Sequence, residues 1–209
     1  MTKVSFIFSF TQGLAFFFPA TTVPTQVGPC TFHSTRGVSV DGGVPERLAS
    51  AGPLSFTGLE MPLTIVPTAD NAYSGDVKGR TFEAGNPITM TAVGDVVPPF
   101  STTLLAPAIV KTQSPSSLSR GASATVTWTP DATATQFRVF VLGSSGLLDC
   151  SYDGAAGTAL VPAEALELFT PGDKVQLVPA PVASKTLDLP GWQVETLILQ
   201  TDEHTSGTL

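Results

Sequence analysis

The sequence predicts an all-β protein made of two packed antiparallel β-sandwiches, with one short helix near residues 162–169. Three observations lead to this fold class. Apolar and polar side chains alternate with a period of two over many short segments, as in half-buried strands. Turn-forming Gly, Pro, Asn and Asp recur about every eight to twelve residues, which is typical of sandwiches and barrels. Helical periodicity is confined to the one short segment, which argues against a parallel α/β fold.

Residues 121–143 show this pattern most clearly, as two strands joined by a turn. Along 124–129, apolar residues alternate with threonines, and Trp128 falls on the apolar side. Pro130 cannot donate to a strand ladder, so the first strand is expected to end there. In the second strand, 136–142, one face carries Phe137, Val139 and Val141 and the other carries Arg138, Phe140 and Leu142. We therefore expect the large Trp128 ring to be buried under the second strand and to anchor a core.

The rest of the chain is expected to divide near residues 106–109. The N-terminal sandwich would span 1–107, the C-terminal sandwich 108–201, and a flexible polar tail 202–209. In the helix, a proline suits the first position and an acidic residue the positive N-terminus. The expected strands are 54–56, 63–66, 80–82, 88–93 and 102–105 in the first sandwich, and 109–112, 124–129, 136–142, 147–151, 158–161, 174–179 and 192–199 in the second.

Residues 4–18 are unusually aromatic, since six of the thirteen phenylalanines lie in the first 20 residues. Lys3 followed by this apolar stretch resembles a secretory signal. Polar residues interrupt it, however, and favour a β-hairpin that turns at Gln12 and Gly13. Such a ribbon either joins the sheet of its own domain or mediates self-assembly by pairing with another chain. No segment reaches about 18 uninterrupted apolar residues, so no membrane span is expected.

Charge and cysteine content restrict the partners and the compartment. The net charge is −7 and no Lys/Arg cluster occurs, which argues against nucleic-acid binding. Charged residues make up only 13%, and such a neutral surface suits a secreted, periplasmic or cell-surface protein with a protein or cell-surface partner. Cys30 and Cys150 either form a disulfide in an oxidising compartment, which would join the two expected domains, or remain small buried hydrophobes.

Two resemblances follow from specific segments. Residues 108–201 resemble a fibronectin type III or bacterial Ig-like domain through ATVTWTP, which ends at Pro130, through QFRVFV at 136–141, and through ELFTPGDKVQLVP at 167–179. The segments GPLSFTG and FEAGNPITMTAVGDVVPPF make the whole chain similar to uncharacterised secreted β-proteins of myxobacteria-like genomes. The first resemblance implies a sandwich fold; the second implies a surface or periplasmic location and no known activity.

The sequence contains no convincing catalytic arrangement. GSSG at 143–146 is expected to be a hairpin loop, because a nucleophile elbow needs Gly-x-Ser-x-Gly between a strand and a helix. A Cys30–His33 pair is a weak candidate for nucleophile and base. A glycosidase pair drawn from Asp41, Glu46, Glu60 or Glu83 has nothing in the sequence to bring two carboxylates together. A hydrolase is therefore the least favoured function.

Two weak ligand sites remain, and neither implies a required cofactor. Calcium is possible at a loop that offers hard oxygen ligands from Asp70, Asn71 and Asp76. A less favoured carboxylate set comprises Asp131, Asp149 and Asp153. A sugar-binding platform would use the aromatic rings of Tyr73, Tyr152 and Trp192. We thus expect a non-catalytic structural, adhesion or partner-binding module, with a sugar- or calcium-binding module as the alternative.

Overall fold

The computed structural model describes residues 2–9, 14–17, 24–34, 49–69, 71, 73, 82–199 and 205–209. The chain divides into two compact units, each built from three separate segments: unit 1 comprises Met1–Thr21, Glu46–Ala108 and Val182–Gln200, and unit 2 comprises Thr22–Pro45, Ile109–Pro181 and Thr201–Leu209. The break after Ala108 lies at the expected boundary. The contiguous ranges 1–107 and 108–201 differ from these units, because long-range strand pairing assigns segments from both ends of the chain to each unit.

Unit 1 has one mixed sheet, in the order β2-β1-β15-β14. The N-terminal ribbon forms an antiparallel hairpin, but β1 also pairs in parallel with β15, where fully antiparallel sheets were expected. A parallel pair needs a long connection, and most of the chain lies between these two strands. Both edges of β1 are therefore paired within the chain. The strands are β1 (Thr2–Ser9), β2 (Leu14–Phe17), the second half of β14 (Lys174–Leu189) and β15 (Trp192–Leu199).

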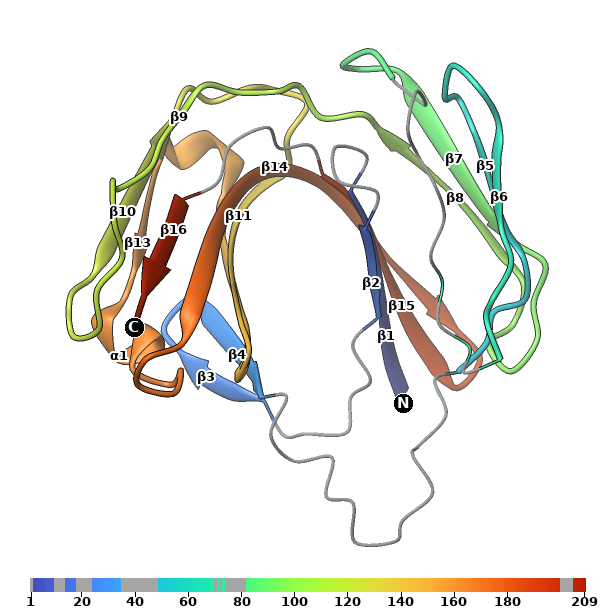
Figure 1. Ribbon diagram of the computed structural model, residues 1–209. Coiled ribbons are helices and arrows are strands. Elements are labelled where there is room, and N and C mark those ends of the chain that lie inside the picture. The colour runs from blue at the N-terminus through green and yellow to red at the C-terminus, as the bar shows by residue number, and fades with distance from the viewer. Residues whose placement is uncertain are drawn as a thin grey trace, which may run out of the picture. The chain divides into compact units, whose positions relative to one another are not determined.

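The second sheet of unit 1 is antiparallel, in the order β6-β5-β7-β8 (Figure 1). Its inward residues, such as Phe56 and Ile88, form one core with Val194 and Ile198 of β15. Most of the strand expected at 80–82 lies outside the described residues, and Phe82 packs against this core without strand structure. The strands are β5 (Leu54–Thr57), β6 (Leu63–Ile65), β7 (Pro87–Ala92) and β8 (Phe100–Leu105).

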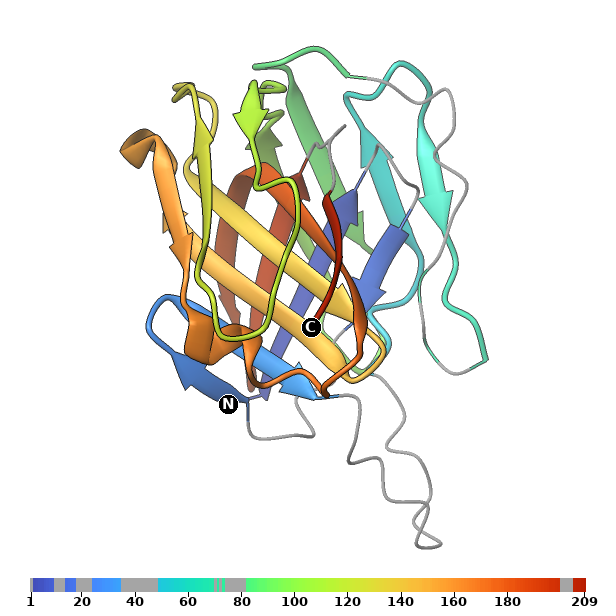
Figure 2. The same cartoon turned by 60° about the vertical axis from the view of Figure 1, so that its left-hand side comes forward.

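Unit 2 is a second sandwich. Its larger sheet runs β14-β11-β12-β4-β3, with β16 also paired to β14, and its smaller sheet runs β13-β10-β9. In Figure 2 the yellow-green β10 stands in front of the gold β11 and β12, as two layers. The elements are β3 (Thr25–Val27), β4 (Cys30–Ser34), β9 (Thr112–Gln113), β10 (Ala124–Trp128), β11 (Gln136–Gly143), β12 (Gly146–Asp153), the 3-10 turn Gly154–Ala156, β13 (Thr158–Val161), α1 (Ala163–Leu166) and β16 (Thr205–Thr208).

Trp128 anchors the core of unit 2, as the alternation predicts. Its side chain is 7% exposed and stacks on Phe137 of the opposite sheet, with ring centroids 3.8 Å apart. Its indole N–H donates to the Gly154 carbonyl at 2.9 Å, so the buried polar atom is satisfied. The all-β sandwich prediction is confirmed, and Trp128 joins the two layers of this unit.

Three local expectations in unit 2 need correction. The helix expected over 162–169 is only one turn, α1, because Pro162 at its N-cap makes no side-chain cap and turns follow at once. The strand expected at 174–179 continues to Leu189 as β14. The tail expected to be flexible contains β16, which pairs with β14, and Leu209 is 5% exposed in the core.

Proline positions explain how β14 continues without a complete ladder. Its first residues pair with β16 through Leu177, and its pairing with β15 begins at Val182. Pro179 and Pro181 fall between these two ladders. Proline has no N–H to donate, so these two positions of β14 need no hydrogen-bond acceptor where neither β16 nor β15 is paired. In the described part of the chain, no helix has the length and apolar character needed to cross a bilayer.

Candidate functional site

The aromatic residues expected to bind sugar have structural contacts. Tyr73 is 2% exposed, and its hydroxyl accepts from the Ala51 N–H and donates to the Gly52 carbonyl, each at 2.8 Å. Trp192 is half-buried against the core of unit 1. Tyr152 belongs to unit 2. The three residues therefore pack in two different units, and Tyr73 fastens the chain just before β5.

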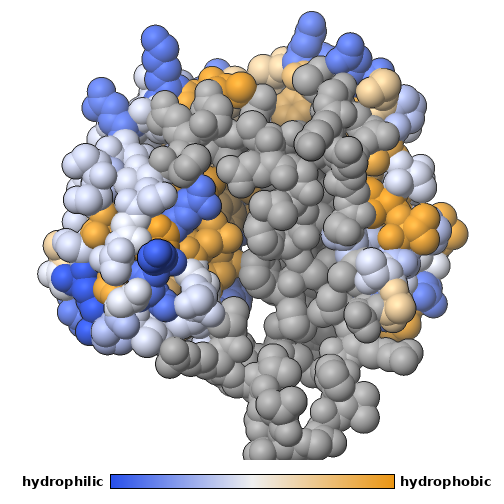
Figure 3. Space-filling model, viewed as in Figure 1, coloured by the Kyte–Doolittle hydropathy of each residue, from blue (hydrophilic) through white to orange (hydrophobic). Residues whose placement is uncertain are grey.

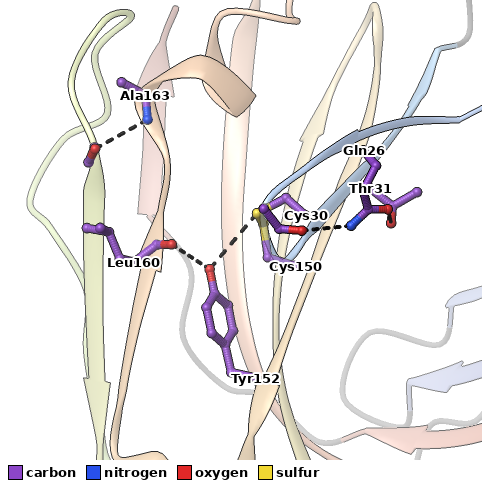
Figure 4. Close-up of a disulfide and its surroundings, with 9 residues drawn as sticks. Gln26, Cys30, Thr31, Cys150, Tyr152, Leu160 and Ala163 are labelled. Atoms are coloured by element: carbon purple, nitrogen blue, oxygen red, sulfur yellow. Dashed lines mark hydrogen bonds between the residues drawn. A yellow bond between two sulfur atoms is a disulfide. The ribbon is translucent and has the colours of Figure 1, made fainter.

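Tyr152 lies beside a disulfide between Cys30 and Cys150, which face each other across the antiparallel β4–β12 ladder (Figure 4). The bond joins the ranges 1–107 and 108–201, as expected, but both cysteines belong to unit 2, so it lies within one unit. The Tyr152 hydroxyl donates to the Leu160 carbonyl at 2.7 Å and lies 4.0 Å from the Cys30 sulfur. Burial of the ring raises the pKa of Tyr152 to about 12. This cluster ties β4, β12 and β13 together.

Among the residues that the structure describes, the catalytic candidates have the following positions. Cys30 is part of the disulfide and so offers no thiolate. His33 stands three residues away on the same strand, and its position in the ladder puts it on the opposite sheet face. Asp41 and Glu46 lie outside the described residues, and Glu60 and Glu83 are exposed.

The GSSG segment is the tight β11–β12 turn, with Gly143 paired to Gly146. Asp173, which sequence reasoning did not select, holds this turn from the loop before β14. Its carboxylate accepts from the Ser145 hydroxyl, from the Ser144 hydroxyl at 2.7 Å and from the Ser145 N–H at 3.2 Å. The side-chain hydrogen bonds from Ser145 and then Ser144 hold the pKa of Asp173 below its ordinary value of 3.8. These hydrogen bonds hold the β11–β12 turn against the loop before β14.

The first predicted calcium loop is described only in part. Asp70 and Asp76 lie outside the described residues, and Asn71 has a positive φ of 60°, with its N–H donating to the Thr68 carbonyl at 2.9 Å. Asparagine tolerates this left-handed conformation, which suits a turn. Within the described ranges, no three His, Cys, Asp or Glu side chains gather as a metal site would require. Calcium therefore stays a prediction.

The second carboxylate set has separate structural roles. Asp131 accepts from the Thr133 N–H at 2.8 Å, and Asp153 accepts from the Ala155 N–H at 2.9 Å, each in its own turn. Asp149 forms an ion pair with Arg138 at 2.8 Å, with side-chain exposures of 18% and 9%. Removing one member of so buried a pair would leave the other charge uncompensated. These three aspartates thus stabilise unit 2 and do not converge.

A groove of about 730 Å³ opens in unit 2 where the end of β11, the start of β14 and β16 lie side by side. Leu142 and Val175 give it an apolar part. Its polar side chains are Lys174, Gln176, Ser206 and Thr208. None of the described lining residues is a carboxylate, although the chain as a whole is acidic. The groove could therefore accept a hydroxylated or anionic small molecule.

The most extensive surface feature is the outer face of the β6-β5-β7-β8 sheet. Because strand side chains alternate between faces, most apolar residues of these strands point to the core and most hydroxyl residues point outward; Thr102 of β8 is buried, and Leu105 at the end of β8 is exposed. The strand register arranges them in two rows. We call this surface the hydroxyl face: Thr64, Ser55, Thr91 and Ser101 form the first row, and Thr57, Thr89 and Thr103 form the second.

Cross-strand hydrogen bonds organise the hydroxyl face. The hydroxyls of Thr89 and Thr103 lie 2.7 Å apart, and those of Thr91 and Ser101 lie 3.2 Å apart. None of the residues in the four strands is charged. Pairing of this kind contributes to sheet stability and also holds the hydroxyls in fixed positions.

Exposed apolar residues border the hydroxyl face at both ends of its strands. Val66 and Val93 follow β6 and β7, and each is 64% exposed, while Leu105 ends β8 and is 54% exposed. Orange apolar groups stand beside pale side chains at the right-hand margin of Figure 3, where these strands lie in the same view. Large side chains exposed together in this way are characteristic of interaction surfaces.

Comparison with known proteins identifies no family for this chain. No protein-family model and no curated protein matches the chain. Among solved structures, the chain is similar to a two-domain fibronectin type III segment of chicken tenascin, with 17% identity and a TM-score of 0.31, covering 75% of this chain and 82% of that one. An overlap this low carries no argument about function. The resemblance to secreted proteins of myxobacteria-like genomes finds no support.

Proposed function

We propose that this protein is a non-catalytic structural and partner-binding module of the cell envelope or exterior, and that it binds through the hydroxyl face. The observation that carries the proposal is a charge-free sheet face with ordered hydroxyls and exposed valines in a chain of net charge −7. Surfaces of this kind suit an uncharged partner surface, because no charge has to be desolvated on binding. The disulfide supports an oxidising compartment.

Binding to isolated envelopes from cells that make the protein naturally tests this proposal. Thr91 is exposed at the centre of the hydroxyl face, so Thr91→Lys would place a charge in the contact. Thr158→Lys makes the same change at an exposed strand position of unit 2 and serves as the matched control. We expect the wild type and the control to sediment with envelopes and T91K to stay in solution. Equal sedimentation of all three would exclude the hydroxyl face as the binding surface.

A second candidate function is ligand binding in the groove of unit 2, which supports the sugar-binding alternative at a different place from the predicted aromatic platform. The groove combines hydrogen-bonding side chains with the Lys174 ammonium group. In a screen of neutral and acidic glycans, a glycan that binds in the groove should raise the melting temperature of the wild type but not that of Lys174→Ala. Calcium binding at the loop of Asp76 is tested in the same assay by comparing the wild type with Asp76→Asn.

A further inference from the structure

We infer that the hydroxyl face binds a second copy of this chain, so that two sheets meet face to face in a weak symmetric dimer. This inference rests on the proposed function and names the partner of that surface. The hydroxyl face belongs to the β6-β5-β7-β8 sheet of unit 1, whose strands are all described.

Hydroxyl chemistry makes the face complementary to itself. A serine or threonine hydroxyl both donates and accepts a hydrogen bond, so a two-fold rotation can bring donors opposite acceptors without any change of residue type. All seven side chains of the face have this property. A face with only donors or only acceptors could not pair with its own copy.

The distribution of charge also favours a second copy of the chain as the partner of the hydroxyl face. Two copies with a net charge of −7 each repel one another over most of their surface. The four strands carry no charged residue, so contact through this face places no carboxylates against each other. The valines and Leu105 at its border would lose exposed apolar area on contact, which supplies attraction. Added salt screens the remaining repulsion and should strengthen the dimer.

The size of the face sets the expected strength. Four strands about 4.8 Å apart span about 19 Å, and six residues of β7 or β8 extend about 20 Å. The projected area is therefore about 400 Å² for each copy, before the relief of the side chains and the apolar border are added. The two copies together would bury about 800 Å², less than the roughly 1,200 Å² of stable specific interfaces, which indicates a transient dimer with a dissociation constant in the micromolar range or above.

Sedimentation equilibrium of the full disulfide-bonded chain, from nanomolar to high micromolar concentration, tests the inference. The average mass of the wild type should rise towards twice the monomer mass, and more so at higher salt. Thr91→Lys and Thr103→Lys should each weaken the dimer at least about tenfold, because a charge would be buried without a partner. The Thr158→Lys control should match the wild type. Circular dichroism identifies any variant that fails to fold, and Thr103 on the edge strand is the more tolerant of the two sites.

The outcomes separate this inference from the proposed function. A wild type that stays monomeric at all concentrations overturns the dimer. If the monomer still binds envelopes through the hydroxyl face, the proposed function holds, and the partner of that face is another molecule. If T158K weakens the dimer as much as T91K, the copies meet elsewhere and the inference is again wrong. Loss of the dimer in T91K and T103K alone supports it.

Discussion

Breaking the Cys30–Cys150 bond should destabilise the protein more than any single surface change. The two cysteines are 120 residues apart, so the bond closes a large loop in the unfolded chain. The chain-entropy relation gives about 5 kcal/mol for a loop of this length. Residual structure in the unfolded chain reduces the measured effect, and we expect about 2–4 kcal/mol. For a chain of this size, that corresponds to a melting temperature lower by about 5–15 °C.

The assay compares thermal melting of the oxidised protein, the chemically reduced protein and the double variant Cys30→Ala/Cys150→Ala. Reduction removes the bond and keeps both side chains, so agreement between the last two samples assigns the loss to the bond itself. Hydrogen exchange should accelerate at the amides of the β4–β12 ladder more than in the β10–β13 ladder. Identical melting of oxidised and reduced protein would show that the bond does not stabilise the fold, and the reasoning would fail.

Substitutions at three residues of unit 2 give further predictions, tested by chemical or pH denaturation. Trp128→Ala should lower the free energy of unfolding by about 3–5 kcal/mol. Trp128→Phe keeps a stacking ring and should lower it by only about 1–3 kcal/mol, because the Gly154 carbonyl loses its hydrogen-bond donor. Equal losses for the two variants would contradict the stacking role. The pKa of Tyr152 is raised from 10.0 to about 12, so its contribution to stability should be complete below pH 10 and should be lost as the pH rises towards 12. Tyr152→Phe has no phenol to ionise and should not show this loss. Leu209→Ala should lower the free energy of unfolding by about 2–5 kcal/mol. If the variant has the same urea midpoint as the wild type, the Leu209 side chain lies outside the core.

Local features of the fold could be read from the sequence. Alternation predicted β10 and β11 and the burial of Trp128, because the side-chain period of a strand appears within a few residues. The GSSG turn was predicted in the same way, since glycine and serine favour a tight hairpin. Each of these features depends only on neighbours in the chain.

Strand pairing between distant segments could not be predicted. Nothing near Thr2–Ser9 indicates a parallel partner in β15, because register between remote strands depends on the completed core. The two cysteines suggested a bond between Cys30 and Cys150, but not that β4 and β12 pair as neighbouring strands of one unit. Tyr73, a candidate site residue, also has contacts with distant residues that its neighbours in the sequence do not indicate. Its surroundings in sequence are polar and turn-like, which suggested exposure, but its ring enters the core and its hydroxyl binds backbone groups before β5.

The interleaved order of the two units makes a strong prediction about truncation. A fragment of residues 108–201, the C-terminal domain expected from the sequence, would lack Cys30, Phe32 and Leu209 from the core of unit 2. It would also keep Val194 and Ile198, whose core partners on β5 and β7 would be missing. Lost core contacts and newly exposed apolar area both disfavour folding, and domain stabilities are only about 5–15 kcal/mol in total. We therefore expect poor amide dispersion in NMR spectra and no cooperative melting for this fragment. A well-dispersed spectrum would mean that unit 2 folds without its first and last segments, and the division described above would have to be redrawn.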